Sequence, residues 1–290
     1  MLTFLSFVLF AVSVPQNFLN STDFPVNPVA RLSMSSTPLK NENPINLFLN
    51  SRAFFAYDFK SGTPLVAKNE QTRLPIASLT KIATAVTAME TYNLNDVLIV
   101  PANITTVQGS KMELWSGERI SVRALLHGLL IVSANDAALV LAGNTSEKQA
   151  QFIEKMNAIA TRLKLHNTHF SNSVGFDEAE NYSTAYDLAL LTKYFLQNPL
   201  LRQIVATKKI TISSADNRIH HELKNINALL QSDPDFLGVK TGTSPAAGKS
   251  FVGLSKNARG QEIITVVLDS PARFEETETL AKWVWQAFRW

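Results

Sequence analysis

Apolar positions recur with the period of an α-helix in the segment ASLTKIATAVTAMET, residues 77–91. With a rotation of about 100° per residue, one stripe of this helix holds Ser78, Lys81, Ile82, Ala85 and Met89. The threonines of the segment gather on the opposite face, where a charged side chain would meet water. A lysine on the apolar stripe is therefore unusual. We expect the Lys81 amine to be buried in the folded protein.

Beyond residue 50, strand patterns lie near the two ends of the chain and helix patterns lie between them. Residues 52–68 contain two β-rich runs about a turn at Ser61 and Gly62, which predicts a hairpin. Further helices are expected over residues 121–132, capped by Ser121, and over 147–165, 184–198 and 276–290. Strands are expected over residues 236–244, 249–256 and 261–270. This order predicts an α+β fold in which helices pack on one antiparallel sheet.

The N-terminal segment carries a signal for export. Residues 2–14 form a charge-free apolar run that ends at Pro15 and is too short to span a bilayer as a helix. We expect residues 1–15 to be a signal peptide or a short membrane anchor; a buried N-terminal strand or helix is the alternative. Residues 16–44 are rich in Pro, Ser, Thr and Asn, which predicts a flexible linker. The globular domain is then expected over 45–290, outside the cytoplasm.

Composition excludes several classes of function. The chain has 290 residues, a net charge of +3 and no basic run interleaved with aromatic residues, so no nucleic-acid partner is expected. It has no cysteine, which excludes disulfides, thiolate metal sites and cysteine nucleophiles. The histidine pairs at 166/169 and 220/221 lack carboxylates at ligand spacing, so no metal site is expected.

The segment GTSPAAGKS, residues 242–250, resembles a phosphate-binding loop only superficially. Five residues rather than four separate Gly242 from Gly248, and a strand rather than a helix follows Lys249. Without a helix N-terminus no dipole would receive a phosphate group. We therefore expect no nucleotide cofactor.

Three short motifs remain, and their order and context matter more than any one of them. They are Ser-x-x-Lys at Ser78 and Lys81, Ser-x-Asn at Ser133 and Asn135, and Lys-Thr-Gly at residues 240–242. Each string alone occurs by chance, as a second Ser-x-Asn at Ser255 illustrates. Here, however, the first motif begins a predicted helix, the second lies between two helices and the third lies on a strand.

The first motif makes chemical sense on a helix. A serine hydroxyl is a poor nucleophile until a base takes its proton, and a side chain three residues along a helix can reach it. Lys81 can be that base only when its amine is neutral. Burial and a second cation nearby both disfavour the ammonium form, and Lys240 is the candidate cation. The helix N-terminus at Ser78 adds partial positive charge where an oxyanion would form.

The three motifs in this order resemble those of the penicillin-recognising serine acyl-transferases, which include penicillin-binding proteins and serine β-lactamases. Longer matches resemble the low-molecular-mass D-alanyl-D-alanine carboxypeptidases, from about residue 50 to the end of the chain. They are PIASLTKIATA, IVSANDAALVLA, FSNSVGFDEAENYSTAYDLALL and GVKTGTSPAAGKSFVG. The resemblance implies a β-lactamase/transpeptidase-like fold, with a mainly helical subdomain beside the sheet.

The resemblance also implies roles for the first two motifs. Ser78 would be the nucleophile and Lys81 its base. Ser133 would relay a proton to the departing amine. Asn135 would orient the substrate amide and contact Lys81.

The third motif would bind the substrate. The resemblance implies that Thr241 and Thr243 hold a terminal carboxylate beside Lys240, and that Gly242 lets the substrate backbone approach the strand. Backbone N–H groups of Ser78 and Thr243 would form the oxyanion hole. Arg273 falls where family members carry an arginine that pairs with the carboxylate; a solvated arginine near a helix start is the alternative.

The implied activity is removal of the terminal D-alanine from peptidoglycan stem peptides through an acyl-enzyme on Ser78. β-Lactams would acylate the same serine, and no metal or organic cofactor would be needed. Three alternatives stay open: a D,D-endopeptidase that cleaves crosslinks, as shorter members of the family do; a β-lactamase; and a non-catalytic penicillin-binding sensor. The acid-x-x-Leu-Asn string that class A β-lactamases use for deacylation is absent from the chain.

Overall fold

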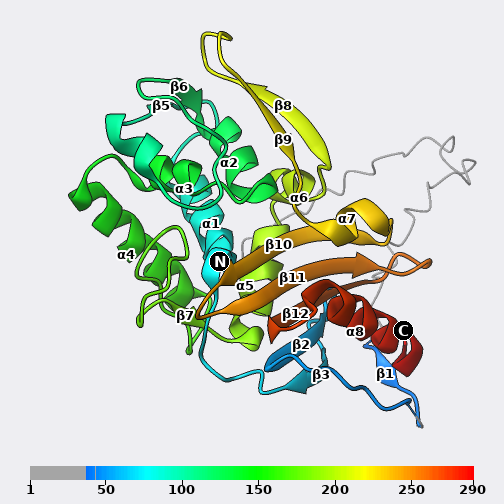
Figure 1. The fold of residues 1–290 in the computed structure, drawn as a ribbon. Coiled ribbons are helices and arrows are strands. Elements are labelled where there is room, and N and C mark those ends of the chain that lie inside the picture. The colour runs from blue at the N-terminus through cyan, green and yellow to red at the C-terminus, as the bar shows by residue number, and fades with distance from the viewer. Residues whose placement is uncertain (1–36, 43) are drawn as a thin grey trace, which may run out of the picture. The chain divides into compact units, whose positions relative to one another are not determined.

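The computed structural model describes residues 37–42 and 44–290. The predicted signal peptide or anchor, residues 1–15, lies outside the described residues. At the centre of the described part is a five-stranded antiparallel sheet with the order β10-β11-β12-β2-β3 (Figure 1). Its strands are β2 (Ala53–Asp58), β3 (Pro64–Lys68), β10 (Phe236–Ser244), β11 (Gly248–Lys256) and β12 (Glu262–Ser270). Because β12 pairs with β2, the sheet joins segments from the two ends of the domain.

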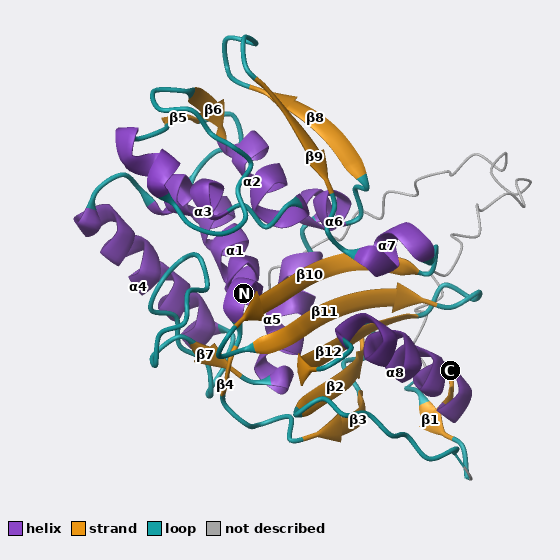
Figure 2. Ribbon diagram, in the orientation of Figure 1, coloured by secondary structure: helices purple, strands orange, loops and turns teal. Residues whose placement is uncertain are grey.

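Helices cover both faces of this sheet. Helix α8 (Arg273–Ala287) packs on one face, against β11 and β12, and α5 (Ala185–Leu196) packs on the other, against β12 and β2 (Figure 2). Strand β12 shows the consequence, because successive side chains point to opposite faces. Its residues Ile264, Val266 and Leu268 belong to the larger core that includes α5. Ile263 and Val267 belong to the smaller core under α8.

A mainly helical subdomain adjoins the sheet on the α5 side (Figure 1). Its helices are α1 (Lys81–Thr91), α2 (Val122–Ile131), α3 (Asn135–Ala142), α4 (Ser146–Arg162) and α6 (Pro199–Val205). Two pairs of antiparallel strands extend from it. One is β5 (Val97–Ile99) with β6 (Arg119–Ser121), and the other is β8 (Lys209–Ser213) with β9 (His220–Lys224). Further short elements are η1 (Ala77–Thr80), η2 (Ala102–Thr106), α7 (Ala228–Ser232) and the pair β4 (Leu74–Pro75) with β7 (Tyr182–Ser183).

The α+β prediction is confirmed, as are the first hairpin and the three C-terminal strands. The helix expected over 77–91 begins with a 3₁₀ turn, η1, before α1 starts at Lys81. Neither of these two short strand pairs of the helical subdomain was predicted. Their strands have at most five residues, too few for a clear alternation of apolar and polar positions.

The start of the folded domain and the end of the closing helix differ from the expected bounds. The closing helix ends at Ala287, and β13 (Phe288–Arg289) pairs with β1 (Leu39–Lys40), inside the segment expected as a linker. The Asn41 backbone N–H donates to Ala287 O at 2.8 Å. The folded body therefore begins before residue 45, because backbone pairing between distant segments leaves no mark on composition. Among the described helices, none has the length and apolar character needed to cross a bilayer.

The N-cap of α2 provides a test of these local assignments. Ser121 Oγ accepts a hydrogen bond from Ala124 N at 3.2 Å, as expected for a capping serine. Ser121→Ala removes this acceptor and should lower the free energy of unfolding by about 1 kcal/mol in urea denaturation. Ser121→Asp keeps an acceptor and adds favourable charge at the helix N-terminus, so its stability should stay near that of the wild type. An alanine variant as stable as the wild type would contradict the assignment.

Candidate active site

Ser78 and Lys81 lie side by side where η1 passes into α1. Their three-residue spacing places Lys81 Nζ 2.8 Å from Ser78 Oγ. Lys81 Nζ also donates to Val174 O at 2.7 Å, which fixes the amine in place. Ala77 has a φ of 46°, a left-handed conformation that is costly for a residue with a Cβ and that occurs at sharp functional turns.

The environment of Lys81 favours its neutral form. The side chain is fully buried, with 0% of its surface exposed. Burial lowers the pKa of the Lys81 amine well below the ordinary value of 10.5, and the charge of Lys240 lowers it further. Asp136 opposes this shift, but its effect is the smallest of the three. A neutral amine can accept the proton of the Ser78 hydroxyl.

The second motif joins the end of α2 to the start of α3. Ser133 has a φ of 62° and accepts a hydrogen bond from Lys240 Nζ at 2.8 Å. Asn135 is the first residue of α3, and its backbone N–H donates to Ser110 O at 2.7 Å. The structure therefore brings the second and third motifs into direct contact.

The expected contact between Asn135 and Lys81 is not found among the hydrogen bonds of the described residues. The Asn135 side-chain amide donates instead to Gln108 O at 2.7 Å. Lys81 Nζ is already engaged by Ser78 and by the Val174 carbonyl. The carbonyl groups of the loop around Gln108 thus set the orientation of the Asn135 amide.

Lys240 lies on β10, the edge strand of the sheet, and its amine is buried between two acceptors. Besides Ser133 Oγ, Lys240 Nζ reaches Thr241 O at 3.0 Å. Burial lowers the pKa of Lys240 to about 7, with a further contribution from the charge of Arg273. Lys240 can therefore change its charge near neutral pH.

Gly242 lets β10 pack closely against the segment that carries Ser78. A Cβ at Gly242 would lie 2.8 Å from Ile76 O and 3.2 Å from Leu79 Cγ, so β10 could not pack against η1. At Gly175, where φ is +93°, a Cβ would lie 2.0 Å from Ala77 O. Two glycines from distant segments thus enclose the turn that carries Ser78.

Arg273 is half-buried and lies against β10. It is the first residue of α8, and its guanidinium donates to Gly242 O at 2.9 Å and to Thr243 Oγ1. Side chains alternate along β10, which places Thr241 and Thr243 on one face and Lys240 on the other. Thr241 is buried, with 5% of its surface exposed.

A pocket of about 280 Å³ opens beside Ser78. Its lining consists of Ser78, Gly109, Ser110, Asn135, Val174, Gly175, Phe176, Asp177, Thr243, Ser244 and Pro245. Sequence reasoning did not single out the loops at 109–110 and 174–177, although residues 174–177 lie in the matched segment FSNSVGFDEAENYS. Asp177 joins these walls, because its carboxylate accepts from Ser244 Oγ at 2.5 Å and from Ala246 N at 3.1 Å. Among the described residues, no group of three or more His, Asp or Glu side chains is placed to hold a metal ion.

Comparison with known proteins agrees with this geometry. The family model described as D-alanyl-D-alanine carboxypeptidase matches residues 40–272, most of the chain. The chain belongs to the D-alanyl-D-alanine carboxypeptidase family. It is therefore a serine hydrolase of the carboxypeptidase type. The resemblance seen in the three motifs is confirmed.

Individual relatives extend this result. The D-alanyl-D-alanine carboxypeptidase of Streptomyces sp. (strain K15) is 36% identical over 238 residues, which cover 76% of this chain and 81% of the relative. The crystal structure of the Streptomyces K15 DD-transpeptidase superposes with a TM-score of 0.78 at 32% identity, covering 83% of this chain and 99% of that chain. A D-alanyl-D-alanine endopeptidase of Pseudomonas aeruginosa is 29% identical, covering 88% of this chain and 84% of the relative. Carboxypeptidases of Bacillus subtilis and Escherichia coli are longer, and the chain spans 54% and 62–64% of their lengths.

The titration of Lys240 predicts a pH-dependent Michaelis constant. Its charge is present below about pH 7 and is lost as the pH rises through that value, so attraction for a peptide carboxylate weakens. KM for a peptide with a free C-terminus should rise several-fold between about pH 6 and about pH 9. Lys240→Met should abolish this rise, whereas Lys60→Met, at the exposed turn between β2 and β3, should keep it. A KM that stays constant with pH in the wild type would contradict the assignment.

Proposed function

We propose that the protein removes the terminal D-alanine from peptidoglycan stem peptides through an acyl-enzyme on Ser78. One observation carries this proposal: Lys81 Nζ lies 2.8 Å from Ser78 Oγ, and the amine is fully buried. This is the arrangement that a serine nucleophile with a neutral amine base requires. Ser78 also lines the pocket beside β10, where a peptide can reach it.

Acylation begins with proton transfer from Ser78 Oγ to neutral Lys81. The oxygen forms a bond to the carbonyl carbon that precedes the terminal D-alanine, and the carbonyl oxygen becomes an oxyanion. The backbone N–H groups of Ser78 and Thr243 stabilise this charge, together with the partial positive charge at the helix start. The lining of the pocket by both Ser78 and Thr243 supports this assignment.

Breakdown of the intermediate releases D-alanine. The C–N bond breaks as Ser133 relays to the departing amine the proton that Lys81 took from Ser78, which leaves Lys81 neutral again; the hydrogen bond between Ser133 and Lys240 supports this role. A water molecule then attacks the ester, with Lys81 as the base that takes its proton. The shortened peptide leaves, and the proton returns to Ser78 Oγ.

Recognition of the substrate depends on its terminal carboxylate. Arg273 and the hydroxyl groups of Thr241 and Thr243 bind this carboxylate, and the Arg273–Thr243 hydrogen bond supports their joint action. Lys240, on the other face of β10, attracts the carboxylate through its charge. Asn135 orients the substrate amide. Because β10 is an edge strand, its outer backbone groups are free to pair with an extended peptide.

β-Lactams acylate Ser78 in the same way, since their strained amide presents a carbonyl carbon beside a carboxylate. The substrate lies outside the cytoplasm, and residues 1–15 serve as the signal peptide or anchor that brings the enzyme there.

Cleavage of crosslinked peptides by a D,D-endopeptidase is the second candidate function. The similarity to the Pseudomonas aeruginosa endopeptidase, which extends over 88% of this chain, favours it. The two activities share the same acyl-enzyme and differ in the group that leaves. The intact Ser78–Lys81 contact supports either enzyme over a non-catalytic sensor.

Labelling with a fluorescent penicillin tests the proposal. The wild type should be labelled and should release D-alanine from a pentapeptide, whereas Ser78→Ala should lose both activities. Ser255→Ala, the matched change in the second Ser-x-Asn string, should retain both. Release from crosslinked dimers but not from the pentapeptide would identify an endopeptidase. Rapid loss of the label would indicate a β-lactamase, labelling without release from either substrate would indicate a sensor, and an unlabelled wild type would refute the proposal.

A further inference from the structure

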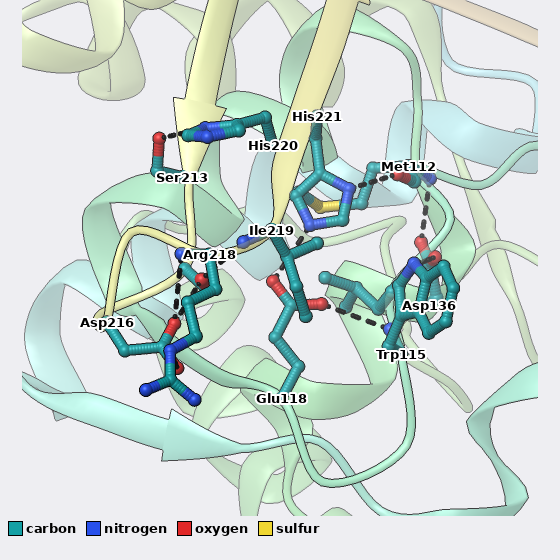
Figure 3. A network of polar contacts seen from close by, with 12 residues as sticks. Met112, Trp115, Glu118, Asp136, Ser213, Asp216, Arg218, Ile219, His220 and His221 are labelled. Atoms are coloured by element: carbon teal, nitrogen blue, oxygen red, sulfur yellow. Dashed lines mark hydrogen bonds and ion pairs between the residues drawn. The ribbon is translucent and has the colours of Figure 1, made fainter.

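Two buried carboxylates hold the loop that forms one wall of the pocket (Figure 3). The Asp136 oxygens accept hydrogen bonds from the backbone N–H groups of Met112 and Leu114, both at 3.1 Å. Glu118 Oε2 accepts from Trp115 N at 3.0 Å. Asp136 and Glu118 have 1% and 4% of their surface exposed. The loop is therefore fixed by charged acceptors inside the protein.

His221 reaches this loop from β9, more than a hundred residues later in the chain (Figure 3). Its ring nitrogens lie 2.9 Å from Met112 O and 2.8 Å from Glu118 Oε1. Met112 O can only accept, so Nδ1 carries a hydrogen and donates to it, and Nε2 shares the second hydrogen bond with Glu118 Oε1. The ring is itself buried. His221 thus ties the loop to the β8–β9 hairpin with two hydrogen bonds.

The same loop orients Asn135. Gln108 O accepts from the Asn135 side-chain amide and Ser110 O from its backbone N–H, both at 2.7 Å. A Cβ at Gly109 would lie 2.7 Å from Asn135 Nδ2, so the loop backbone packs directly on this amide. A shift of the loop would therefore move the Asn135 amide relative to Ser78.

We propose that His221 is a positioning residue for Asn135. From β9 it holds Met112 and Glu118 in place, and through the loop it keeps the carbonyl groups of residues 108 and 110 where they orient the Asn135 amide. The inference rests on the proposed function, in which Asn135 orients the substrate. It adds a residue that none of the three motifs contains.

The two partners of the ring, Met112 O and Glu118 Oε1, determine which substitutions of His221 test the proposal. Removing the ring would leave Glu118 Oε1 buried without a hydrogen-bond partner, which is costly. The loop would then move so that water could reach this oxygen. Phenylalanine preserves the size of the ring but supplies no donor. Glutamine supplies an amide group with two donors. The pair of substitutions separates the hydrogen bonds from the packing.

The experiment measures the rate of Ser78 acylation by a fluorescent penicillin, at a temperature well below the melting temperature of each variant. His221→Phe should slow acylation roughly tenfold or more, because small displacements of orienting groups have large effects on rate. Its amide hydrogen exchange should rise in residues 108–118. His221→Gln should recover most of the rate. His220→Phe is the matched control on the exposed neighbour, which contacts Ser213, and should leave both measurements unchanged.

A folded His221→Phe variant that melts at lower temperature but is acylated at the wild-type rate would overturn the proposal, because only a structural role would remain. If that variant does not fold, Glu118→Gln provides the same test with almost unchanged volume. It should slow acylation and raise amide exchange at Trp115, whose backbone N–H donates to Glu118, and wild-type values for both would overturn the proposal. An unlabelled wild type would instead refute the proposed function.

Discussion

Burial of the Lys81 amine against Ser78 Oγ is the interaction on which the rest of the site depends. Lysine is a base only without its proton, and in water its amine holds that proton through the neutral range. Here burial and the charge of Lys240 lower the pKa of Lys81. Position 81 supplies the required burial because the first two turns of α1, including Thr84 and Thr87 on the opposite face, are buried against the larger core. The base therefore exists only in the folded chain.

The surrounding fold maintains this geometry by bringing distant segments close to one turn. The sheet places β10 beside η1, and Gly242 allows the two backbones to approach. The 174–177 loop supplies the carbonyl that fixes Lys81 Nζ, and Gly175 leaves room for Ala77 O. On the other side of the pocket, buried ion pairs and charged hydrogen bonds hold the loop that orients Asn135. Packing and charge thus combine to position a few reactive atoms.

The sequence was informative where the signal is local and less so where it depends on long-range contacts. The burial of Lys81 was predicted from the helix pattern, although the threonine face expected to meet water is buried as well, at Thr84 and Thr87. The strand of Lys240 was predicted from its own run of residues. The hydrogen bond from Asn135 to Gln108 O was not expected, because Gln108 lies on a loop without a motif. The partner of Glu118, His221, is separated from it by 103 residues, so no spacing rule could reveal the pair.

The most direct test of the account is the titration of the Lys81 amine itself. NMR of the protein labelled at the lysine side chains would follow it, with Lys81→Met identifying the resonance. We expect the titration midpoint of the Lys81 amine to lie well below the ordinary lysine value of 10.5, because the charged form is both buried and close to Lys240. A midpoint at or above that value would show that Lys81 is an ammonium ion at neutral pH. The proposed base for Ser78 would then be wrong.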